Sequence, residues 1–227
     1  MENFHIPKPL HGWREFAGEV GIIVLGVLIA LTAEQLVETL QWHRRVVEAQ
    51  SAMTTELADD DGAQAQARIA LSPCFRSELD GLEHALVAER DGGAPFSAPR
   101  AVPPPFRTWD DNAWRMALSS DAALHMSTAQ MYSWSSAYAF IPDMNEAAIR
   151  ESADWADLGR IRLLRPHPSE IEREAMLTAI GRARHDNDVL TTVSRYFLIF
   201  VGRAGVRVPQ SATSDELQRQ RNEMKAC

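Results

Sequence analysis

Cysteine is scarce in this chain of 227 residues, which holds two, Cys74 and Cys227. Two cysteines make no disulfide framework, and their separation fits no zinc, haem-attachment or CxxC redox motif. They could pair with each other, or with a second chain, in an oxidising compartment. Cys74 lies at a predicted helix start, where a reactive thiolate is favoured, but a small buried residue is the preferred interpretation.

Positive charge is also in short supply. The chain has 23 Lys and Arg against 31 Asp and Glu, a formal net charge of −8. A protein this acidic is a poor binder of phosphate backbones, so nucleic acid is not an expected partner. With 12 glycines, 12 prolines and no low-complexity tract, collagen-like, fibrous and wholly disordered classes are excluded.

Sequence motifs of the common enzyme classes are missing. The chain has no G-x-S-x-G, Walker, G-x-G-x-x-G, HExxH or EF-hand pattern. The histidines that could serve a site are scattered: His84, His125, His167 and His185. His185 with Asp186 and Asp188 is the nearest approach to a ligand cluster, and it would need a further acid or histidine from another helix. We therefore predict no catalytic residue, no cofactor and no metal site.

One long apolar run stands out near the start of the chain. Residues 20–33 carry no charge but span only about 21 Å as a helix, less than the roughly 30 Å hydrocarbon core of a bilayer. The wider segment 16–37 spans about 33 Å. Trp13 and Trp42 flank it about 43 Å apart, which suits interfacial belts. The sequence predicts a transmembrane helix over 16–37, with the lipid bilayer as partner.

Two other interpretations of this run stay open. A cleaved signal peptide would need small residues before the cut, and Leu31 and Ala33 fit that pattern poorly. The other is a buried helix of a soluble protein, and the nearly all-round apolar character of Ile22 to Ile29 argues against it.

Orientation follows from a narrow difference in charge. Lys8 and Arg14 precede the span, and Arg44 and Arg45 follow it. The free amino terminus tips the balance inward. We expect a single-pass protein with a cytoplasmic N-terminus and a C-terminal domain outside the cytoplasm; in a Gram-negative bacterial cell this means the inner membrane and the periplasm.

One stripe of the span carries small residues and an acid. At 100° per residue its members lie within about 60° of one another: Glu19, Gly26, Ala30 and Ala33. Small residues let helix backbones approach, so the stripe is a candidate for self-association into a homo-oligomer. An interpretation of equal weight is that Gly and Ala are common in spans and that Glu19 reaches the interface.

The anchor resembles that of a known group. Gly18-Glu19-Val20, followed by the run from Gly26 to Leu31, is similar to the amino-terminal anchor of uncharacterised bacterial single-pass membrane proteins, whose pattern reads G-E-I/V, five apolar residues, then G-I/V-L-I-A-L. Many members carry a tryptophan five residues past the last Leu, where this chain has Leu36. The resemblance covers about twenty residues. It implies a membrane protein of unknown function and supplies no site residues.

The rest of the chain reads as helix, and the fold class we predict is all-α: a transmembrane helix followed by an antiparallel bundle of about four to five helices. Ser72-Pro73 predicts a helix start, and Ser169 with Glu172 predicts a capping box. The acidic run 59–61 either breaks the preceding helix or forms a solvated turn of it. The expected organisation is an N-terminal tail, the span, juxtamembrane and first bundle helices, a Pro-rich linker, a helical bundle and a polar C-terminal tail, over 1–15, 16–37, 38–91, 92–106, 107–205 and 206–227.

Aromatic residues gather in fewer than fifty positions: Trp109, Trp114, Trp134, Tyr138 and Trp155. They form either the core of the bundle, which is the preferred interpretation, or a surface for a ligand or an unknown protein partner. We expect an extracytoplasmic domain that acts in binding or assembly. The alternative is a sensor-like bundle that holds a small ligand near the tryptophans.

Overall fold

The computed structural model describes residues 12–97 and 102–224. The predicted N-terminal tail and linker therefore lie partly, and Cys227 wholly, outside the described residues. The helical elements follow in the order α1 (Gly12–Thr55), the π-helical turn η1 (Glu56–Asp60), α2 (Asp61–Arg90), α3 (Asn112–Ser119), the 3₁₀ turn η2 (Ala122–His125), α4 (Thr128–Tyr138), α5 (Ile141–Leu158), the 3₁₀ turn η3 (Gly159–Leu163), α6 (Glu170–Arg203) and α7 (Gln210–Met224). Residues 12–97 and 102–224 contain no strand, so the predicted all-α class is confirmed.

The described residues divide into two units at Val47 and Glu48, and α1 crosses this boundary. The first unit is the amino-terminal part of α1. Near the N-terminus this helix is long and apolar enough to cross a membrane, and none of its most apolar window is buried. Residues such as Ile22 and Ile29 are 75% and 62% exposed, so nothing in the described chain covers this surface.

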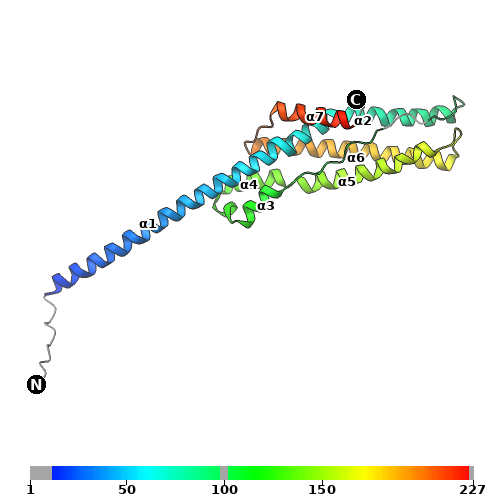
Figure 1. The fold of residues 1–227 in the computed structure, drawn as a ribbon. Coiled ribbons are helices and arrows are strands. Elements are labelled where there is room, and N and C mark those ends of the chain that lie inside the picture. The colour runs from blue at the N-terminus through cyan, green and yellow to red at the C-terminus, as the bar shows by residue number, and fades with distance from the viewer. Residues whose placement is uncertain (1–11, 98–101, 225–227) are drawn as a thin grey trace, which may run out of the picture. The chain divides into compact units, whose positions relative to one another are not determined.

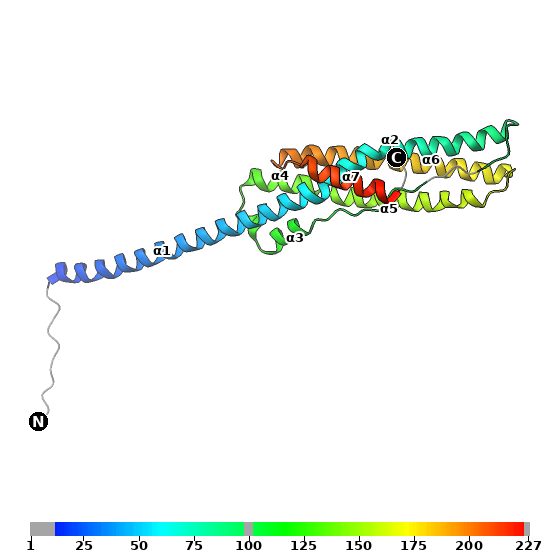
Figure 2. The same cartoon turned by 45° about the horizontal axis from the view of Figure 1, so that its top comes forward.

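The second unit is a bundle built on three long helices. Figures 1 and 2 both show α2, α5 and α6 side by side, with α6 running opposite to the other two. Ion pairs between side chains show the same antiparallel direction for α2 and α6. Arg76 of α2 pairs with Asp188 of α6, whereas Arg173 near the start of α6 pairs with Glu89 near the end of α2. This arrangement agrees with the antiparallel bundle predicted from the sequence.

The core is formed by apolar residues spaced along one face of each helix. Met53 and Leu57 are fully buried, and so are Leu79, Leu82 and Leu86 of α2. Farther along, a cluster joins α2, α5 and α6 to the segment after α2 and to α7; its large members include Leu71, Phe75, Phe96, Trp155, Ile180 and Met224. Burial of this face supplies the main stabilisation of the bundle.

Both predicted helix signals at Ser72 and Ser169 can be compared with the structure. Ser169 is the N-cap of α6, with its hydroxyl and Glu172 forming the complete capping box. The predicted start at Ser72 is wrong, because Pro73 lies inside α2. An internal proline removes one backbone hydrogen bond, and here the packing of α2 against α6 on both sides of Pro73 keeps the helix continuous.

The acidic run 59–61 neither ends the helix nor forms an ordinary turn of it. Residues Glu56–Asp60 form a π-helical turn between α1 and α2. The wider turn brings the Leu57 carbonyl oxygen close to Gly62, where an added Cβ would lie 2.4 Å from it and 2.4 Å from Val208. The glycine is therefore required by the close approach at this turn.

Described parts of the Pro-rich linker and of the polar C-terminal tail pack on the bundle. Residues 92–97 and 102–106 of the Pro-rich segment are not helical, and Phe96 in it and Trp109 shortly after it are buried. The polar tail forms α7, which packs on α2 and buries Glu216, Gln220 and Met224. The helix is thus part of the bundle, because Glu216, Gln220 and Met224 lie at four-residue steps on one buried face.

Candidate functional site

A buried polar network crosses the middle of the bundle. The Arg68 side chain of α2 makes an ion pair with Glu151 of α5, and both side chains are 6% exposed. Arg68 Nη2 also donates to Asn187 Oδ1 of α6 at 2.9 Å, and Asn187 Nδ2 donates to Ser72 Oγ at 3.0 Å. The guanidinium lies over the Phe75 ring, 4.7 Å from its centroid. Three helices are joined here by one cation.

A small cavity adjoins this network. It has a volume of about 20 Å³, the room that one or two water molecules need. Its polar walls come from α2, α5 and α7, through Gln64, Arg68, Glu151 and Gln220, and its outer wall is the segment Pro104–Arg107 with Trp109. The cavity therefore lies between the helices and the segment that links α2 to α3.

Several polar atoms at this cavity have no hydrogen-bond partner among the described residues. Arg68 Nε and Nη1, Trp109 Nε1 and Gln64 Oε1 are all buried and unpaired. Unpaired buried groups are rare in folded proteins because each costs about 1–3 kcal/mol. Four such atoms at one cavity indicate a place where water or a ligand completes the hydrogen bonding.

Burial sets the electrostatics of the network. It lowers the pKa of the Arg68 guanidinium, an effect that the neighbouring Glu151 opposes. Burial likewise raises the pKa of the Glu151 carboxyl, against the attraction of Arg68. Each group thus makes the other's charge tolerable in the interior.

The outer wall is held at its two ends. On one side the Val102 amide donates to Glu78 at 2.8 Å. On the other, Asn145 accepts from the Trp109 amide at 2.9 Å and donates to the Trp109 carbonyl at 2.8 Å. Arg107 pairs with Glu223 of α7 at 2.7 Å. We call residues 102–109 the strap.

The predicted aromatic cluster is spread over several places. Only Trp109 lines the cavity. Trp114 stacks on Tyr138, with ring centroids 5.9 Å apart, and Trp134 is buried in α4. Trp155 belongs to the core cluster. These residues therefore do not form one shared pocket wall in the described chain.

The stripe Glu19, Gly26, Ala30 and Ala33 lies on the exposed part of α1. A shallow hollow on this helix is lined by Leu28, Ile29, Thr32, Ala33 and Leu36. Ala33 is thus the stripe residue that borders a concave surface.

An open groove between α5 and α6 contains two members of the cluster His185, Asp186 and Asp188 that the sequence analysis named. His185 and Asp186 line it with Arg150, Asp154 and Arg182. Asp154 forms a hydrogen bond with Asp186. Burial raises the pKa of Asp186 most, and the hydrogen bond with Asp154 raises it further. Asp188 does not join them, since it pairs with Arg76. The arginines already pair with these acids, which leaves little charge to act on a substrate.

A second group of acids lies at the π-helical turn. Glu56 accepts from the Ala113 amide at 3.0 Å and from the Tyr138 hydroxyl at 2.8 Å. Asp61 accepts from the Asp110 amide at 3.2 Å, and burial raises its pKa to about 8. These carboxyl groups attach the residues around the start of α3 to η1 and to the start of α2.

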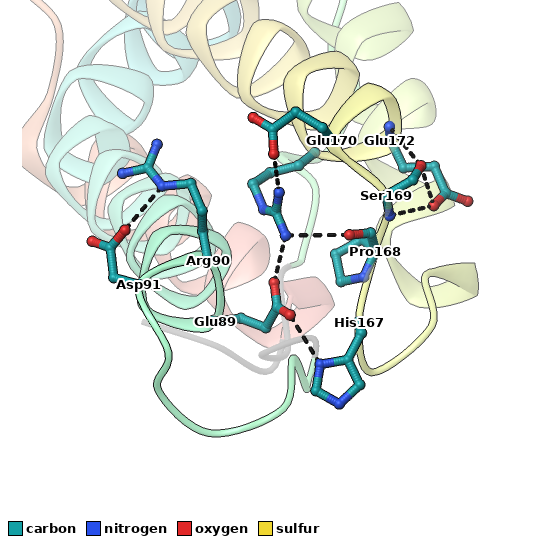
Figure 3. Close-up of polar contacts among 9 residues, drawn as sticks. Glu89, Arg90, Asp91, His167, Pro168, Ser169, Glu170 and Glu172 are labelled. Carbon is teal, nitrogen blue, oxygen red and sulfur yellow. Dashed lines mark hydrogen bonds and ion pairs between the residues drawn. The ribbon is translucent and has the colours of Figure 1, made fainter.

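Polar contacts also close the far end of the bundle (Figure 3). Arg173 donates to Glu89 at 2.7 Å, and to Glu170 and the Pro168 carbonyl. His167 Nδ1 lies 3.0 Å from the other Glu89 oxygen. The hydrogen bond from Arg173 lowers the pKa of Glu89 most, and the hydrogen bond with His167 lowers it further. This group holds the end of α2 against the start of α6 and lines no described cavity.

Sequence reasoning missed Arg68, Gln64 and Glu151. A signal was present: Arg68 lies seven residues after Asp61 and seven before Phe75, both on the buried stripe of α2. A charged residue in register with a core stripe is unusual and marks either a buried pair or a site.

Cys74 is disulfide-bonded, and the predicted role of Cys227 lies outside the described residues. Comparison of the chain with protein-family models, with curated proteins and with solved structures finds no match.

Proposed function

We propose that this chain is a single-pass protein of a bacterial inner membrane whose periplasmic helical bundle binds a small ligand in the cavity beside Arg68. This is the sensor-like alternative among the functions that the sequence suggested. Buried unpaired atoms of Arg68, Trp109 and Gln64 at one cavity are the observation that carries it. Binding is favoured over catalysis because the chain's acids and arginines are largely paired with one another.

Two features support the membrane and periplasmic parts of the proposal. The exposed apolar helix near the N-terminus suits a bilayer. The disulfide at Cys74 suits an oxidising compartment, because disulfides persist there and are rare in the cytosol. The resemblance of the anchor to uncharacterised bacterial membrane proteins agrees with the membrane part.

Topology is tested with a carboxyl-terminal tag. In spheroplasts, added protease should remove the tag, and alkaline carbonate should leave the protein in the membrane. A tag that stays protected would overturn the periplasmic assignment, and release by carbonate would overturn the span.

Ligand binding is tested on the full chain in detergent with ¹⁵N-labelled tryptophan. A panel of small amides, carboxylates, alcohols and amines is added while the indole N–H signals are recorded. The Trp109 signal, assigned with Trp109→Phe, should shift saturably with at least one class. A Trp109 signal that responds to none of them would show that the cavity holds water alone, and the binding function would be lost.

Self-association through α1 is a second candidate function, favoured by the exposed small residues Gly26 and Ala30. Gly26→Cys should form disulfide-linked dimers in oxidised membranes. Leu28→Cys, about 200° around the helix, is the matched control and should crosslink poorly. Equal crosslinking at both positions would argue against a specific contact.

A further inference from the structure

We infer that the cavity beside Arg68 selects a neutral group with the hydrogen-bonding pattern of a primary carboxamide, and that the strap moves outward to admit it. This inference rests on the proposed function and names its ligand class. Three properties of the site carry it: the balance of charge, the pattern of unpaired atoms and the way the strap is attached.

Charge at the cavity is already balanced. Arg68 is paired with Glu151. Arg107, the other cation in the lining, pairs with Glu216 at 3.3 Å and Glu223 at 2.7 Å. An added anion would lie beside Glu151 and an added cation beside Arg68, in an interior where unbalanced charge is costly. A neutral ligand avoids both costs.

The unpaired atoms require both an acceptor and a donor. Arg68 and Trp109 present N–H groups, and Gln64 presents a carbonyl oxygen. The oxygen of a carboxamide accepts from the N–H groups while its NH₂ donates to Gln64. A carboxylate has no donor for Gln64, and an alkylammonium ion has no acceptor for Arg68 or Trp109.

The cavity has a volume of about 20 Å³, which is room for water but not for an amide of several heavy atoms. The strap is suited to open, because Pro103, Pro104 and Pro105 have no N–H with which to bond the helices. Its backbone attachments, at Val102 and Trp109, lie on either side of these prolines, and the Arg107 side chain adds ion pairs to α7. Phe106, between them, is 51% exposed. Outward movement of the prolines therefore breaks no backbone hydrogen bond of their own.

The test titrates the ¹⁵N-tryptophan-labelled full chain in detergent with acetamide, acetate and methylammonium, which differ in charge and in hydrogen-bond donors and acceptors. Acetamide should shift the Trp109 indole signal saturably and bind about tenfold more tightly than the other two, a gap of the size that one mismatched hydrogen bond gives. The indole signals of Trp114 and Trp134, which do not line the cavity, should stay in place.

Two variants locate the effect. Gln64→Leu should weaken acetamide binding about tenfold, because it removes the acceptor for the NH₂ group. Gln66→Leu is the matched control, because Gln66 accepts a hydrogen bond from Thr213 at 2.5 Å and does not line the cavity. The Gln66→Leu variant should bind acetamide as tightly as the parent protein does.

The outcomes separate the two proposals. If acetate or methylammonium binds at Trp109 in preference to acetamide, the ligand class inferred here is wrong while the cavity remains a ligand site. If acetamide binding survives Gln64→Leu unchanged, the assigned donor contact is wrong. If none of the three probes nor any of the wider panel moves the Trp109 signal, the proposed function itself fails.

Discussion

Arg68 and Glu151 are separated by 83 positions in the chain, yet they form a buried ion pair at the centre of the bundle. The pair joins α2 to α5, and Asn187 ties it to α6. A buried charge is costly on its own, so the two residues depend on each other.

This dependence gives a stability prediction. Glu151→Leu should lower the free energy of unfolding by about 3–5 kcal/mol, because it leaves the Arg68 charge unpaired in the interior. The double variant Arg68→Met, Glu151→Leu should lose clearly less than either single variant. Denaturant titration of the helical circular dichroism measures all three. The half-exposed pair Arg76 and Asp188 is the control, and Arg76→Met should cost about 0–1 kcal/mol. Additive losses in the double variant would contradict the coupling.

Asp61 should make stability depend on pH. Its pKa is about 8 in the folded protein against 3.8 ordinarily, so the folded state holds this proton more tightly than the unfolded chain. Stability from this group is full below about pH 4 and falls as pH rises toward about 8. Asp61→Asn should therefore unfold with a free energy roughly 2–5 kcal/mol above the parent at pH 9 and match it much more closely at pH 4. Asp59→Asn, at an exposed position of the same turn, should leave the pH dependence unchanged. A constant difference between Asp61→Asn and the parent across this range would contradict the argument.

Glu89 should act in the opposite direction. Its pKa is lowered in the folded protein by Arg173 and His167, so its contribution is present above about pH 4.5 and is lost as pH falls through the lowered value. Glu89→Gln should be less stable than the parent near neutral pH, and the two should converge in acid. Thermal unfolding across this range measures the difference. A gap that widens in acid would refute the assignment.

Two glycines of α2 should respond oppositely to alanine. At Gly62 a Cβ would meet backbone and side-chain atoms at 2.4 Å, so Gly62→Ala should cost about 1–3 kcal/mol. At Gly81 nothing lies within 4 Å, so Gly81→Ala should raise stability by about 0.5–1 kcal/mol through helix propensity. Denaturant midpoints measure both. Equal effects would show that the π-helical turn relaxes to accept the methyl group.

The sequence by itself determined the helical class and most helix positions. Residues at three- and four-residue steps, such as Leu79, Leu82 and Leu86, have to bury one face of a helix, and the Ser169 capping box fixes where α6 begins. The sequence also determined that the start of α1 needs an apolar environment, because 22 nearly uncharged residues suit lipid or a protein interior and not water.

Tertiary structure decided what local patterns cannot express. Ser72-Pro73 has the local chemistry of a helix start, but contacts of α2 with α6 on both sides keep the helix continuous. Glu56 in the π-helical turn and Asp61 just after it accept hydrogen bonds from residues around the start of α3, a distant part of the chain. The cavity required Gln64, Arg68, Glu151 and Trp109, drawn from three distant parts of the chain. Periodicity specifies which face of each helix is buried, whereas the partner of a buried charge depends on how the helices pack together.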